Sequence, residues 1–102
     1  MIRNFLPKKG DQIGFTMTYP MAVNFTSFEL GVKCDYTDED FVIYRNLGNG
    51  ITKINDFTYQ IIIPTNALDL ETYVYDVRTI YEGVPKTPLS GKIIVKDTVF
   101  NG

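Results

Sequence analysis

Short runs of strand-forming residues, each followed by a cluster of turn formers, dominate this chain. Val, Ile, Thr, Tyr and Phe recur in these runs, and Gly, Pro, Asn and Asp gather between them. Residues 27–34 alternate polar and apolar side chains, which is typical of a strand with one buried and one solvated face. At 102 residues the chain has the size of one domain, so we expect a single all-β domain over residues 1–102.

The run boundaries predict about seven strands with short turns between them. Such spacing favours an antiparallel β-sandwich or a small barrel. The expected strands cover residues 13–19, 27–34, 41–45, 51–54, 57–63, 73–80 and 92–96.

The connections carry their own signals. Asn49-Gly50 predicts a hairpin turn, and residues 64–70 allow one helical turn capped by Thr65 or Asn66. Glu82 to Pro88 reads as a loop, because its two prolines exclude a central strand. Residues 97–102 read as a polar tail.

Composition removes several classes of function. The chain has no histidine and one cysteine, which excludes histidine-based catalytic triads, a zinc site built on His and Cys, and an internal disulfide. A net charge of −2 argues against nucleic-acid binding. No apolar run is long enough to span a membrane, and no apolar core follows the basic start, so neither a membrane partner nor a secretory signal is expected.

Residue clusters that could carry chemistry are weak. The acidic segment 35–40 offers oxygen ligands but lacks the spacing of a calcium loop, so a solvated turn is the better interpretation. Asp76 and Arg78 read as a surface charge pair, and nothing selects a pair of catalytic carboxylates. Cys34 shares the apolar face of its strand, which predicts a buried, inert thiol. We therefore expect no enzyme activity, no catalytic residue, no metal and no cofactor.

One local motif narrows the fold. Residues 69–75 have the spacing of the tyrosine corner, in which a Tyr at the start of the sixth strand of an immunoglobulin-like sandwich bonds back to the preceding crossover. Tyr73 is the expected corner, and Tyr75 stands where antibody domains have their second cysteine. The fold expected is an immunoglobulin-like antiparallel β-sandwich of about seven strands without a disulfide.

The last third of the chain carries a resemblance. Tyr73-Val74-Tyr75-Asp76-Val77, a glycine-containing loop and then Leu89-Ser90-Gly91-Lys92 resemble small bacteriophage structural proteins with an immunoglobulin-like domain. The pattern is similar to the N-terminal domain of phage baseplate upper proteins. The resemblance implies a non-enzymatic virion protein of the tail, baseplate or neck, made in the host bacterial cytoplasm. Tyr73, Tyr75 and Gly91 would then be structural, with Gly91 allowing a tight bend.

Two functions remain open at this point. As a virion subunit, the protein would contact other virion proteins and copies of itself through edge strands, termini and the expected loop at residues 82–88. The alternative is a small bacterial carbohydrate- or protein-binding β-sandwich module, which would need an exposed aromatic platform. Candidate contact residues for a partner are Tyr36, Tyr81, Glu82 and Val84.

Overall fold

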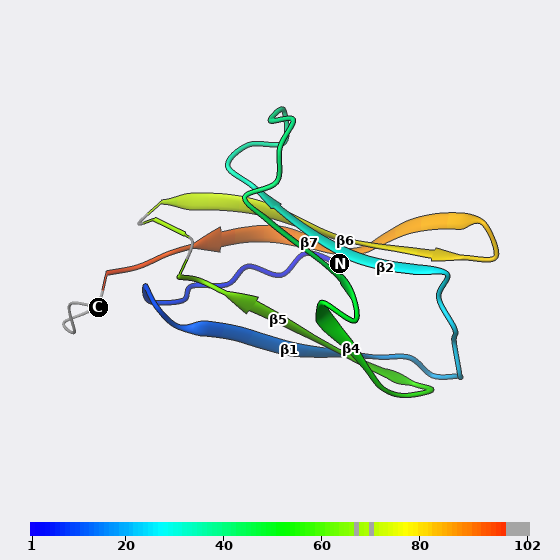
Figure 1. The fold of residues 1–102 in the computed structure, drawn as a ribbon. Coiled ribbons are helices and arrows are strands. Elements are labelled where there is room, and N and C mark those ends of the chain that lie inside the picture. The colour runs from blue at the N-terminus through cyan, green and yellow to red at the C-terminus, as the bar shows by residue number, and fades with distance from the viewer. Residues whose placement is uncertain (67, 70, 98–102) are drawn as a thin grey trace.

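The protein is an all-β fold, as the sequence predicts. A computed structural model describes residues 1–66, 68–69 and 71–97, and these residues include seven strands and no helix. The strands are β1 (Gln12–Thr18), β2 (Ser27–Lys33), β3 (Ile43–Leu47), β4 (Gly50–Asn55), β5 (Thr58–Pro64), β6 (Thr72–Tyr81) and β7 (Val84–Ile94) (Figure 1).

All seven strands belong to one mixed sheet in the order β1-β5-β4-β3-β2-β6-β7. Every neighbouring pair is antiparallel except β3 and β4, which are parallel. The sheet curls into a half-barrel, so that β2, β6 and β7 lie over β1, β5 and β4 (Figure 1). The expected all-antiparallel pairing is therefore wrong at one position.

The parallel pair arises where a hairpin was expected. Only Asn46 with Gly50 and Leu47 with Ile51 are paired between β3 and β4. A hairpin of the expected type needs positive φ at both Asn49 and Gly50, but positive φ falls on Gly48 (86°) and Gly50 (91°) instead. The chain therefore makes a small loop and continues in its original direction, which carries it from one half of the sheet to the other.

The core lies on the concave side of the sheet. In β2 and β5 every second side chain is buried, as the alternation predicts, and β1 and β6 follow the same pattern except at the partly buried Met17 and the exposed Tyr81. The buried apolar residues are Ile13, Phe15, Phe28, Leu30, Val32, Ile43, Ile51, Tyr59, Ile61, Ile63, Leu68, Tyr73, Tyr75, Val77, Leu89, Ile93 and Val95.

Two residues that the alternation places on the buried face of a strand are exposed in the structure. Cys34 lies just beyond the end of β2 and is exposed, and Phe57 precedes β5 in a turn and is 46 % exposed. The period of two holds only while the backbone remains extended, so the residue next to a strand end need not follow it. The prediction of a buried Cys34 is wrong.

The N-terminal segment adds a further edge to the sheet, which the sequence did not signal. It runs parallel to β7, with bridges from Ile2 to Ser90 and from Phe5 to Ile93. The Phe5 ring stacks on Phe15 of β1 at 5.2 Å between centroids. In Figure 1 this segment runs between the two halves of the curled sheet.

Residues 82–88 are not a loop. Glu82 and Gly83 form a two-residue turn with φ of 50° and 79°, and β7 begins at Val84. Pro85 is accepted because β7 is an edge strand there: in the described part of the chain, the N-terminal segment hydrogen-bonds to β7 only from the Pro88 carbonyl onward. Pro88 itself lies in the register shift between β6 and β7, where it has no partner residue in β6.

The segment before β6 is described in part. The Leu68 N–H donates to the Thr65 carbonyl at 2.9 Å, which makes a turn. The Thr65 hydroxyl donates to the Asp11 carbonyl and so joins this segment to the start of β1. Residues 67 and 70, within the expected helical turn, and residues 98–102 of the expected tail lie outside the described residues.

Candidate functional site

The structure brings three of the four candidate contact residues together at one end of the molecule. Tyr81, Glu82 and Val84 form the tip of the β6–β7 hairpin, with Tyr81 paired to Val84. Tyr36 lies in the loop after β2, on a different part of the surface. The four residues are therefore not one site.

The hairpin tip shares its end of the molecule with two other segments. The β1–β2 connection and the β4–β5 turn lie at the same end (Figure 1), and backbone hydrogen bonds join the connection to both Asp56 and Ile80. Five large apolar side chains in these segments, or next to them at the end of β4, are exposed. They are Met21 (67 %), Ile54 (53 %), Phe57 (46 %), Tyr81 (45 %) and Val84 (54 %), and we call this set the hairpin-end patch.

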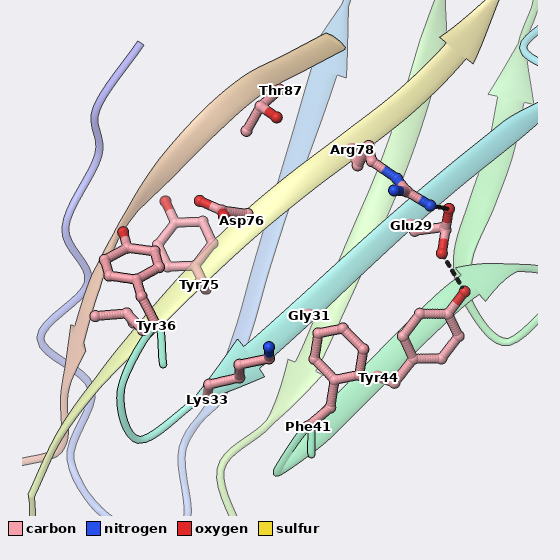
Figure 2. A pocket seen from close by; sticks show the side chains of 11 residues that line it. Glu29, Gly31, Lys33, Tyr36, Phe41, Tyr44, Tyr75, Asp76, Arg78 and Thr87 are labelled. Atoms are coloured by element: carbon pink, nitrogen blue, oxygen red, sulfur yellow. Dashed lines mark hydrogen bonds and ion pairs between the residues drawn. The ribbon is translucent and has the colours of Figure 1, made fainter. Parts of the chain in front are cut away.

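A pocket of about 340 Å³ lies on the outer face of β2 and β6 (Figure 2). It collects aromatic rings, two acids and two bases from β2, β3, β6 and the loop between β2 and β3. Its lining is Glu29, Gly31, Lys33, Tyr36, Phe41, Tyr44, Val74, Tyr75, Asp76, Arg78 and Thr87.

Gly31 forms the floor of this outer-face pocket. It is paired with Tyr44 of β3 on one side and with Asp76 of β6 on the other. A Cβ at position 31 would overlap the Phe41 ring, so the missing side chain lets this ring lie against the strand. Lys33 Nζ stands 5.0 Å from the Phe41 ring centroid, and the Tyr44 ring is 5.4 Å away. The ring of Phe41 is held in place although it is half exposed.

A hydrogen-bonded cluster around Glu29 forms one end of the pocket. The Glu29 carboxylate accepts from the Tyr44 hydroxyl at 2.5 Å and from Arg78 Nη2 at 2.9 Å (Figure 2). It also accepts from the Ser27 hydroxyl at 3.0 Å. These bonds hold the pKa of Glu29 below its ordinary value, and the bond from Tyr44 has the largest effect. The same bond raises the pKa of Tyr44.

The sequence had suggested an ion pair between Asp76 and Arg78. In the structure Arg78 pairs with Glu29 instead. Glu29 and Arg78 are direct cross-strand partners in β2 and β6. Their side chains therefore lie closer together than those of Asp76 and Arg78, which are two positions apart on the same strand. The Asp76 carboxylate forms no hydrogen bond or ion pair with any of the described residues.

The motif residues have structural positions. The Tyr73 hydroxyl accepts from the Asp69 N–H at 2.8 Å, which is the bond that the tyrosine-corner spacing predicts. The Tyr75 hydroxyl donates to the Arg3 carbonyl at 2.5 Å, and burial raises the pKa of Tyr75 to about 12. Gly91 lies within β7, where a Cβ would overlap the Arg3 carbonyl oxygen. Gly91 thus makes room for the N-terminal segment and does not form the tight bend that was expected.

Sequence reasoning missed the pocket as a unit. Phe41, Tyr44 and Asp76 had been assigned to strands without a shared role, because the pocket depends on which strands become neighbours. The only local signal was Gly31, an isolated glycine within an alternating strand, which often marks the close approach of another group.

The acidic segment 35–40 forms its own hydrogen bonds. Asp35 accepts from the Thr37 N–H at 3.0 Å, and the Asp35 N–H donates to Asp38 at 3.1 Å. The Thr37 bonds hold the pKa of Asp35 below its ordinary value. Among residues 1–66, 68–69 and 71–97, no three His, Cys, Asp or Glu side chains gather as metal ligands. Within the same residues no helix is long and apolar enough to cross a membrane.

Comparisons with known proteins do not supply a family for this chain: no family model matches it, and the search of curated proteins finds no related sequence.

Proposed function

We propose that the protein is a non-enzymatic assembly subunit that acts through protein–protein contacts at the hairpin-end patch. The observation that carries the proposal is the exposure of five large apolar side chains on three segments at one end of the molecule. Exposed apolar side chains concentrated in one region of a protein are typical of interaction sites, whereas scattered ones are ordinary. Tyr is among the residues enriched where partners meet.

The rigidity of the hairpin supports this role. Glu82 is in the left-handed region and is followed by Gly83, so the two-residue turn matches the twist of the long strands on either side. The Phe25 ring, which packs against the core, contacts the Tyr81 ring at 6.3 Å between centroids. Tyr81 and Val84 are therefore presented on a tip with few alternative conformations, which lowers the entropy cost of binding.

The fold we propose is immunoglobulin-like. In such domains one sheet joins the second, fifth and fourth strands, and the other joins the third, sixth and seventh. Here β1-β5-β4 and β2-β6-β7 follow that order when the N-terminal segment is counted as the first strand and β3 as an additional strand beside the third. Only two residue pairs join the halves at β3 and β4, and the Tyr73 bond to Asp69 adds the tyrosine corner.

A bacteriophage virion is the setting we propose. The support is the resemblance of residues 73–78 and 89–95 to phage baseplate and small tail proteins, together with the immunoglobulin-like strand order. The partners would be neighbouring virion proteins and further copies of this chain, which could meet head to tail in a ring.

Sedimentation of the purified chain tests the contact surface. We expect association that grows with concentration and that is lost in the double variant Tyr81→Ser, Val84→Ser. Tyr36→Ser, which also removes an exposed tyrosine but lies outside the hairpin-end patch, should associate as the parent does. A strict monomer at high concentration, together with absence of the protein from purified phage particles by mass spectrometry, would refute the proposal.

A further inference from the structure

We propose that the outer-face pocket binds a neutral saccharide. This inference is independent of the hairpin-end patch, because the two share no residue. The volume of about 340 Å³ is at the lower end of the range for ligand pockets, which suits a small ligand. The argument rests on the rings, on the free carboxylate and on the charge balance of the lining.

Two exposed rings offer apolar surface to a ligand. Phe41 is 51 % exposed and Tyr36 is 59 % exposed, and both line the pocket. Phe41 is fixed between Gly31, Lys33 and Tyr44, so little conformational entropy is lost when a ligand covers it. The exposed half of this ring offers apolar surface against which the C–H face of a sugar can pack.

Asp76 supplies the polar contact. It is half-buried on β6 beside Gly31, and its carboxylate has no hydrogen bond or ion pair within the described part of the chain. By contrast, the two oxygens of Glu29 already accept three hydrogen bonds. An ionised carboxylate accepts through both oxygens, so Asp76 can take two neighbouring hydroxyl groups. The exposed Thr87 hydroxyl lines the same space.

The charges of the lining favour a neutral ligand. Lys33 and Arg78 contribute two positive charges, and Glu29 and Asp76 contribute two negative ones. The Arg78 charge is neutralised by Glu29 at 2.9 Å, and Lys33 Nζ donates to the Asp38 carbonyl at 2.7 Å. An anionic ligand would be repelled by the Asp76 carboxylate, while Arg78 and Lys33 are already bound to Glu29 and to the Asp38 carbonyl. A ligand with hydroxyl donors and an apolar face satisfies Asp76 and the rings together.

Titration of the full chain with neutral methyl glycosides, followed by amide chemical shifts, tests the site. The probes are the methyl glycosides of glucose, galactose and N-acetylglucosamine, with glucosamine as a cationic comparison. We expect at least one of them to shift amides of β2, β6 and residues 36–44 in a saturable way, with the hairpin tip unaffected.

Two variants and two matched controls locate the binding. Asp76→Asn should weaken the affinity about tenfold, as expected for loss of a charge-assisted hydrogen bond. Phe41→Ala should remove saturable binding. Asp40→Asn makes the same acid-to-amide change in an exposed residue outside the lining, and Tyr81→Ser changes the hairpin-end patch, so both should bind as the parent does.

Several results would overturn the inference. They are the absence of saturable shifts with all three glycosides, shifts that Asp76→Asn and Phe41→Ala leave unchanged in folded protein, or binding only of the cationic sugar glucosamine. The last result would show that the rings and Asp76 select an ammonium group. None of these results bears on association through the hairpin-end patch, so the two proposals can fail separately.

Discussion

The phenolic oxygen of Tyr73 accepts a hydrogen bond from the backbone N–H of Asp69 at 2.8 Å. Tyr73 is the second residue of β6 and is 2 % exposed, whereas Asp69 lies in the crossover that leads from β5 to β6. Burial raises the pKa of Tyr73, so the hydroxyl stays neutral at physiological pH. This single bond ties the crossover between the two halves of the curled sheet to a core residue.

Removing that hydroxyl should destabilise the fold. Tyr73→Phe keeps the ring in the core but leaves the Asp69 N–H without its acceptor, so we expect a loss of about 1 kcal/mol in the free energy of unfolding. Tyr19→Phe is the matched control, because the buried Tyr19 hydroxyl has no hydrogen-bond partner among the described residues. That variant should be as stable as the parent or more stable. Urea unfolding of both variants would contradict this account if Tyr19→Phe were the more damaging change.

Gly91→Ala should displace the N-terminal segment. The new Cβ would overlap the Arg3 carbonyl oxygen, and overpacking of this kind costs about 1–3 kcal/mol. Gly14→Ala is the control, because a Cβ at that position in β1 meets nothing within 4 Å. Hydrogen exchange gives the specific readout.

In the parent, the amides of Arg3 and Phe5 donate to the Ser90 and Lys92 carbonyls at 2.9 Å. Their protection should fall in Gly91→Ala and stay unchanged in Gly14→Ala. Equal protection in both variants would mean that the segment does not depend on the gap that Gly91 leaves.

Strand identity could be predicted because it is a local property. The alternation in residues 27–33 and 58–64 fixes which side chains enter the core, and the structure buries Phe28, Leu30 and Val32 as expected. The role of Tyr73 could also be predicted from the sequence, since the corner bond joins residues four apart.

What depends on long-range pairing could not be predicted. The N-terminal segment docks on β7, 88 positions later in the sequence, and no local pattern in residues 2–8 distinguishes a docked segment from a free one. The pocket needs Gly31, Tyr44 and Asp76 to become neighbours through two strand pairings. The hairpin predicted at Asn49-Gly50 was wrong because the turn signal does not specify which residues take positive φ.

Cys34 should react with alkylating reagents in the folded protein, because its side chain is exposed. Desolvation and then the Glu71 carboxylate, 3.5 Å from Sγ, raise the pKa of the thiol and so keep the thiolate scarce at neutral pH. Glu71→Gln removes the negative charge and should increase the alkylation rate several-fold. An unchanged rate, or a Cys34 that reacts only on unfolding, would contradict the observed position of the side chain.

We expect the protein to lose stability at alkaline pH because of the raised pKa of Tyr75. Its pKa is about 12 in the folded protein against an ordinary value of 10.0, because burial disfavours the phenolate. The folded state therefore holds the phenolic proton more tightly than the unfolded state. The resulting stabilisation, roughly 2–3 kcal/mol for such a shift, is fully present below pH 10 and is lost as the pH rises from about 10 to 12.

Urea unfolding across this pH range, with tyrosinate absorbance recorded alongside, measures the effect. Tyr75→Phe loses the bond to the Arg3 carbonyl and should be less stable at neutral pH, but its stability should fall less steeply between pH 10 and 12 than that of the parent. Tyr19 and Tyr73, whose pKa values burial also raises, remain in the variant, so some slope should persist. Parallel curves for parent and variant would show that Tyr75 ionises without opening the fold, and the N-terminal segment would then not depend on its neutral hydroxyl.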